Sequence, residues 1–118
     1  MNSSQQYFLK RAAELLKNKE DKNEKIETIK KYFERIGSSH NLDECYDRLE
    51  TAFLRAGESI KNKNKKNSKK QDYLDYGYNF GSLFGVLGAL HYGHQITNKE
   101  YEALQQVIIL EYRGGVEE

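Results

Sequence analysis

A chain of 118 residues can bury one hydrophobic core but hardly two, so we expect a single domain over residues 1–118. Its longest apolar tract, about 80–92, is shorter than a membrane-spanning helix requires. The formal net charge of +1 hides a segregation, because residues 61–71 carry six lysines and no acid, whereas residues 72–118 carry two basic and seven acidic groups.

Cys45 is the only cysteine, which excludes a disulfide within one chain. The N-terminal residues lack the apolar core and small-residue cleavage site of a signal peptide, so a cytoplasmic protein is expected. Cys45 falls on the apolar face of a predicted helix, which favours a core side chain over a catalytic thiol.

Three helices are predicted in the first half of the chain. The first begins at Ser3, which forms a capping pattern with Gln6, and runs to about Lys19. The second presents one apolar stripe and ends at Gly37. The stripe of the second helix consists of Ile26, Ile29, Phe33 and Ile36. The third follows a capping pattern at 41–44, and its apolar face carries Leu42, Cys45, Leu49, Ala52, Phe53, Ala56 and Ile60.

Residues 61–71 have no apolar side chain and cannot be buried, so we expect an exposed, Lys/Asn-rich loop there. Asp72 can cap a fourth helix over 73–92. No charged residue occurs between Asp75 and Lys99, which predicts a central helix with neighbours on several sides.

Glycines at intervals of four interrupt this apolar helix, at Gly77, Gly81 and Gly85. Each glycine costs about 1 kcal/mol of helix propensity relative to alanine. Because glycine lets another backbone approach closely, we expect a second helix against Gly81 and Gly85, either within the chain or across a dimer.

Gly93 should end the fourth helix, and Thr97 with Glu100 forms a capping box for a fifth that Gly114 and Gly115 stop. The tract Val-Ile-Ile-Leu at 107–110 could be a strand instead, but no second β-rich run is present to pair with it. The predicted fold is an all-α bundle of about five helices that ends in a tight helical hairpin.

The Lys/Asn-rich helical chain, with its final hairpin written GHQITNKEYEAL, resembles the small accessory proteins of phages and mobile elements of low-GC bacteria. The resemblance is one of style and transfers no functional residue. It implies a protein that binds and modulates another macromolecule, such as an inhibitor or adaptor of host machinery.

The leading hypothesis is therefore a non-enzymatic protein-interaction module, with a homodimer as one form of it. Tyrosines cluster at the start of the fourth helix on more than one face, so they cannot all be buried in a small monomer. The predicted interface consists of Tyr73, Tyr76, Tyr78, Phe80, Gly77, Gly81 and Gly85.

Two alternatives stay open. The first is a nucleic-acid-associated protein that contacts phosphates through Lys61, Lys63, Lys65, Lys66, Lys69 and Lys70. The second is a small metal protein or enzyme centred on His91 and His94, which would need further ligands such as Cys45, His40 or Glu100. The sequence predicts no cofactor and no membrane partner.

Overall fold

The computed structural model describes residues 3–33 and 42–117, with side chains for all of these except 42–45 and 114–117. Within those ranges the chain is helical and contains no strand, which confirms the predicted all-α bundle, and the tract 107–110 is helical. The five helices are α1 (Ser3–Leu15), α2 (Lys22–Phe33), α3 (Leu42–Lys63), α4 (Lys70–Tyr92) and α5 (Asn98–Glu117).

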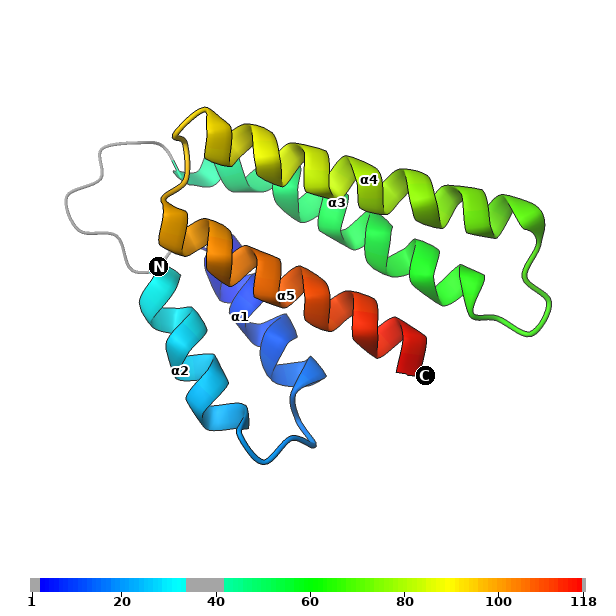
Figure 1. Cartoon of the computed structure of the whole chain (residues 1–118), viewed down its shortest axis with the longest axis horizontal. Helices are drawn as coiled ribbons and strands as arrows, with labels where there is room; N and C mark the ends of the chain where they lie inside the picture. The colour runs from blue at the N-terminus through cyan, green and yellow to red at the C-terminus, as the bar shows by residue number, and fades with distance from the viewer. Residues whose placement is uncertain (1–2, 34–41, 118) are drawn as a thin grey trace.

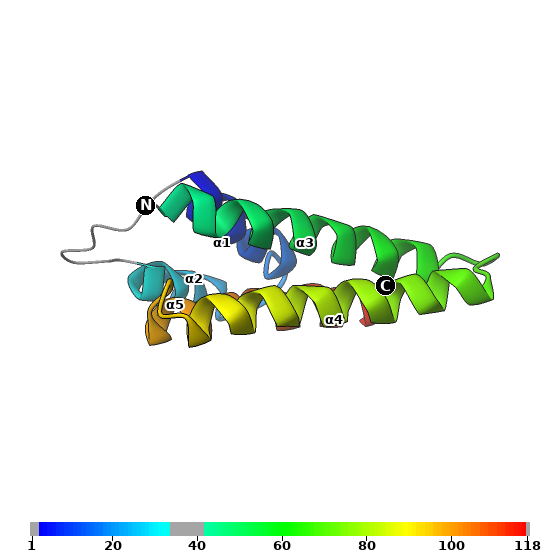
Figure 2. The ribbon, with the colours of Figure 1, turned by 90° about the horizontal axis from the view of Figure 1, so that it is seen from above.

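The helices lie in two layers. Seen from above in Figure 2, α1 and α3 form one layer, and α2, α5 and α4 form the other. Helices α3 and α4 run antiparallel along each other and make the most extensive helix pair. The far end of this pair reaches beyond the C-terminal end of α5 (Figure 1), so the short connection at 64–69 lies at a projecting tip.

The prediction that the fourth helix is central was wrong. Helix α5 contacts each of the other four helices, whereas α4 contacts α3 and α5 only. Helix α4 buries one stripe, which consists of Phe80, Leu83, Leu87 and Leu90 at spacings of three, four and three. Its uncharged opposite side faces outward, so lack of charge along a helix did not indicate a neighbour on every side.

Several predicted helix ends also moved. Helix α1 ends at Leu15 rather than Lys19. Helix α3 continues to Lys63 and α4 begins at Lys70, so the predicted loop at 61–71 shrinks to 64–69. The Asp72 carboxylate accepts the backbone N–H of Lys69 at 2.8 Å, three residues before it, and thereby caps the first turn. Helix α5 runs through the glycine pair to Glu117.

Most described residues of the two predicted apolar stripes are buried in the core, namely Ile29, Phe33, Leu49, Phe53, Ala56 and Ile60, and Ile26 is half-buried against it. Helices α1 and α5 add the buried side chains of Phe8, Ala12, Leu104, Val107 and Ile108. Ala52 is half-buried and packs against this core. Ile36, Gly37 and His40, and the side chains of Leu42 and Cys45, lie outside the described residues.

The capping box at the start of α5 is present as predicted. The Thr97 backbone N–H donates to Glu100 Oε1 at 3.0 Å, and the Glu100 N–H donates to Thr97 Oγ1 at 3.1 Å. Glu100 is fully buried, which the sequence does not suggest for a capping residue.

The other carboxylate oxygen of Glu100 links α5 directly to α3 and α1, and to α2 through Gln5. It accepts the Tyr46 hydroxyl of α3 at 2.6 Å and the side-chain N–H of Gln5 of α1 at 3.3 Å. The same Gln5 amide lies 3.3 Å from the Phe33 carbonyl at the end of α2 and from the Tyr46 hydroxyl. We call Gln5, Tyr46 and Glu100 the buried polar node, because a buried carboxylate is tolerated only when donors surround it.

A second buried carboxylate lies on the same face of α5. Glu111 is eleven residues after Glu100, about three helical turns, and receives two hydrogen bonds from Arg11 of α1, at 2.6 and 2.8 Å. These bonds raise the pKa of Arg11 and keep the guanidinium charged. Gly57 of α3 makes room for this pair, since a Cβ there would lie 3.1 Å from Glu111 Oε1.

The buried polar node predicts that the Tyr46 hydroxyl oxygen has a large effect on the stability of the fold. Replacing Tyr46 by Phe removes the 2.6 Å donor to Glu100 and should lower the free energy of unfolding by about 1–3 kcal/mol. Urea unfolding followed by circular dichroism measures the change. Tyr78→Phe is the matched control, because that side chain is 75% exposed. Equal unfolding midpoints for the two variants would show that the node contributes nothing.

Candidate interaction surface

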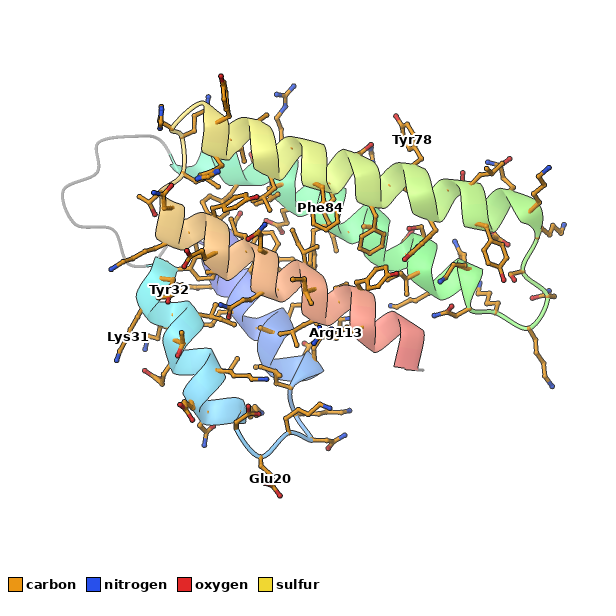
Figure 3. The ribbon with its side chains drawn as sticks, viewed as in Figure 1. Glu20, Lys31, Tyr32, Tyr78, Phe84 and Arg113 are labelled. Atoms are coloured by element: carbon orange, nitrogen blue, oxygen red, sulfur yellow. The ribbon has the colours of Figure 1, made fainter. Side chains whose placement is uncertain are left out.

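The outward side of α4 is uncharged and open to solvent. Tyr78 is 75% exposed and projects away from the bundle (Figure 3), and Tyr92 is 89% exposed. Glycine, alanine and serine occupy the positions between them. We call this surface the α4 outer face and define it as Tyr78, Gly81, Ser82, Gly85, Gly88, Ala89 and Tyr92, which share one side of the helix at 3.6 residues per turn.

The glycines of α4 are not packed against another helix of this chain. A Cβ built at Gly77, Gly81, Gly85 or Gly88 would meet no atom within 4 Å. The predicted close approach within the chain is therefore wrong. The cost of these glycines in helix propensity has no compensation inside the monomer. Close approach of a second helix across a dimer stays a prediction.

The predicted interface residues divide into two groups. Tyr73, Tyr78 and the glycines at 77, 81 and 85 are exposed. Phe80 is only 6% exposed and Tyr76 is half-buried, so both face the core instead. Phe80 therefore cannot form part of an outer contact surface in this structure. The sequence analysis missed Tyr92, although it lies on the same side of α4 as Gly81 and Gly85.

Tyr76 and Phe80 instead hold the end of α5 against the projecting α3–α4 pair, which we call the arm. Their rings lie 6.0 and 5.8 Å from that of Tyr112, centroid to centroid, and 5.1 Å from each other. Burial, together with the neighbouring Tyr112 hydroxyl, raises the pKa of Tyr76 to about 12. Lys63 Nζ lies 4.2 Å from the centre of the Tyr76 ring, a cation–π contact across the α3–α4 pair.

The lysines of the predicted basic tract gather around the projecting tip. We call this surface the basic tip and define it as Lys61, Lys63, Lys65, Lys66, Lys69 and Lys70. Among the described residues, none of the six forms an ion pair with a carboxylate. Of the acidic groups counted after residue 71, Glu100 and Glu111 are buried in the bundle, whereas Asp72 and Asp75 lie on the first turns of α4 beside the tip.

The two histidines of the metal hypothesis are separated by the end of α4. His91 stacks on Tyr101 with ring centroids 4.0 Å apart, and its Nε2 lies 2.7 Å from Asn98 Oδ1. His94 follows the helix, is exposed, and has a left-handed backbone with φ of 59°. Glu100 is engaged in the buried polar node. In the part of the chain with described side chains, no three His, Cys, Asp or Glu residues gather in a metal-binding group.

Hollows in the surface are shallow and have mixed linings. One of about 260 Å³ lies above the Arg11–Glu111 pair, with Tyr7 and Lys61 at its edge. Another, of about 420 Å³, runs beside the α4 outer face. It is lined by Arg48, Ser82, Gly85, Val86, Ala89, Leu90 and Gln95. None of the five described helices is long and apolar enough to cross a bilayer.

The free space around the glycines gives a simple stability prediction. Gly77→Ala adds a methyl group where no atom lies within 4 Å, so it should raise the free energy of unfolding by up to about 1 kcal/mol through helix propensity. Gly57→Ala is the contrasting variant, because its methyl group would press on Glu111 Oε1. Thermal unfolding checks both. A destabilised Gly77→Ala variant would mean that another part of the chain packs against α4.

No protein family, curated protein or solved structure matches this chain in comparisons of its sequence and fold. The function has to be inferred from the surfaces described above.

Proposed function

We propose that the chain is a non-enzymatic protein-interaction module whose contact surface is the α4 outer face. One observation carries the proposal: the α4 outer face exposes Tyr78, Tyr92 and a row of small residues between them without a single charge. Interface centres are depleted in charged residues and enriched in tyrosine, which has a large apolar ring and a polar tip. The role of an inhibitor or adaptor of host machinery, which the resemblance to phage and mobile-element accessory proteins implies, is consistent with such a surface.

The arrangement also explains why the module can expose this face and stay folded. The buried stripe of α4 packs against α3, and the outer face adds nothing to the core. Residues of the outer face are therefore free to serve a partner. Single exposed apolar side chains are common on protein surfaces and need no explanation, whereas a contiguous exposed patch often marks an interaction site.

The proposal is tested by capturing partner proteins from the native cell extract with the tagged full chain, and by comparing what the unchanged chain and its variants capture. Tyr78→Ala combined with Tyr92→Ala should lose the captured protein and keep the unfolding midpoint, because both side chains are exposed. Leu54→Ala is the matched control, since Leu54 is a 51% exposed apolar residue on α3. Capture that the double variant leaves unchanged would exclude the α4 outer face as the contact surface.

A second candidate function is phosphate binding by the basic tip, in a nucleic-acid-associated role. The observation in its favour is that all six lysines lack an acidic partner among the described residues and surround the projecting end of the arm. Against it, the tip has no arginine, and compact phosphate-binding surfaces usually combine several basic elements.

For the basic tip we expect weak duplex binding at low salt that disappears near physiological salt, with a log–log slope of about −0.9 per phosphate contacted. Changing all six tip lysines to Gln should abolish it. The matched control changes six exposed lysines elsewhere to Gln, namely Lys10, Lys17, Lys19, Lys30, Lys31 and Lys99. Fluorescence anisotropy at two salt concentrations measures the affinity. Tight binding at physiological salt would make nucleic acid the primary partner.

A further inference from the structure

We infer that the α4 outer face pairs with the α4 outer face of a second copy of this chain, antiparallel and centred on Gly85. This inference rests on the proposed function, because it names the partner of the same surface. It follows from the order of side chains along α4, from the position of the charges, and from the hollow beside the helix.

Between Tyr78 and Tyr92 the α4 outer face is symmetric about Gly85, and the exposed Leu74 on the same side of α4 lies outside this stretch. Tyr78 and Tyr92 each lie seven residues from it, on the same side of the helix. Gly81 and Ala89 lie four residues away, and Ser82 and Gly88 lie three residues away. Large and small side chains therefore follow the same order in both directions. A two-fold dimer requires a self-complementary surface of this kind.

Antiparallel pairing also agrees with the charges. In a parallel pair the two basic tips, with six lysines each, would lie side by side and repel. The antiparallel arrangement places the tips at opposite ends of the dimer. Between residues 76 and 98 no charged residue occurs, so the paired stretches of α4 bring no charge of their own into the contact.

The small residues determine how closely the helices approach. With nothing within 4 Å of Gly81, Gly85 or Gly88, a second helix can lie directly on the backbone of α4. Centring on Gly85 brings Tyr78 of each copy level with Tyr92 of the other. The hollow of about 420 Å³ flanks α4 and the residues after it, from Ser82 to Gln95, with Arg48 of α3 in its lining, and so includes that level. An aromatic side chain seated in a hollow is typical of the residues that dominate interface energies.

The area of contact predicts a weak dimer. Tyr78 and Tyr92 are 75% and 89% exposed. Together they would contribute on the order of 300 Å² per copy, against roughly 800 Å² per partner in a standard interface. We therefore expect a weak, transient association that appears only at high protein concentration.

Sedimentation velocity of the full chain from about 1 to 300 µM tests the inference at physiological salt. The mass should rise from 13.8 kDa toward twice that value. Gly85→Leu should weaken association at least tenfold without lowering the unfolding midpoint, since the added side chain has free space in the monomer and leucine has the higher helix propensity. Gly77→Leu is the matched control, because it makes the same change in the same helix outside the symmetric set.

Disulfide trapping tests the direction of pairing. In a Cys45→Ser background, a mixture of Tyr78→Cys and Tyr92→Cys chains should give the mixed disulfide in excess over both homodimers. Excess Tyr78→Cys homodimer would indicate parallel pairing and overturn the inference, as would a chain that stays monomeric throughout the concentration range. Equal weakening by Gly77→Leu and Gly85→Leu would overturn the centring on Gly85.

The capture experiment separates this inference from the function on which it rests. A monomeric chain that still loses another captured protein on Gly85→Leu would retain the α4 outer face as an interaction surface and exclude self-pairing. Capture and mass that are both insensitive to Gly85→Leu would overturn the proposed function as well.

Discussion

The fully buried Glu100 carboxylate holds this bundle together. Through Tyr46 and Gln5 it connects α5 with α3 and α1, and the Gln5 amide extends the connection to the last carbonyl of α2. The carboxylate also caps the helix on which it lies. A buried acid without donors would be strongly unfavourable, so the helices have to adopt the one arrangement that supplies them.

Helix α4 is the exception to this polar organisation. It joins the bundle through one apolar stripe on α3 and through the rings of Tyr76, Phe80 and Tyr112. No polar group of the node comes from α4. The outward side of α4 therefore contributes nothing to the core, and a partner could bind there without disturbing the bundle.

Local patterns predicted most of the helices, because amphipathic stripes and capping boxes act over three or four residues. The capping box of Thr97 and Glu100 and the stripe of Leu49, Phe53, Ala56 and Ile60 are examples. The burial of Glu100 and Glu111 could not be predicted, since their partners Gln5 and Arg11 lie 95 and 100 residues away in the chain. Their spacing of eleven residues on one helix face was the only local signal.

Only part of the candidate surface was predicted from local sequence patterns. Exposed tyrosines and glycines on α4 could be recognised from composition. The inward orientation of Phe80 follows from its spacing of three, seven and ten residues from Leu83, Leu87 and Leu90, a local stripe that the predicted interface did not take into account. The lack of charged residues between Asp75 and Lys99 favours a centrally buried helix. Both a buried and an exposed uncharged helix side fit that pattern, and only the tertiary arrangement distinguishes them.

The projecting α3–α4 pair has a consequence for local unfolding. Between Tyr76 and the connection at 64–69, the turns of α3 and α4 extend past the end of α5 and lie only beside each other (Figures 1 and 2). These turns should open without disturbing the node, so their amide hydrogens should exchange with solvent faster than those around Tyr46. We therefore expect two regions that differ in cooperativity, a slowly exchanging part around Tyr46 and a readily fraying end of the α3–α4 pair. A molecule bound near the arm could be sensed as a change in the exchange rate of that arm alone.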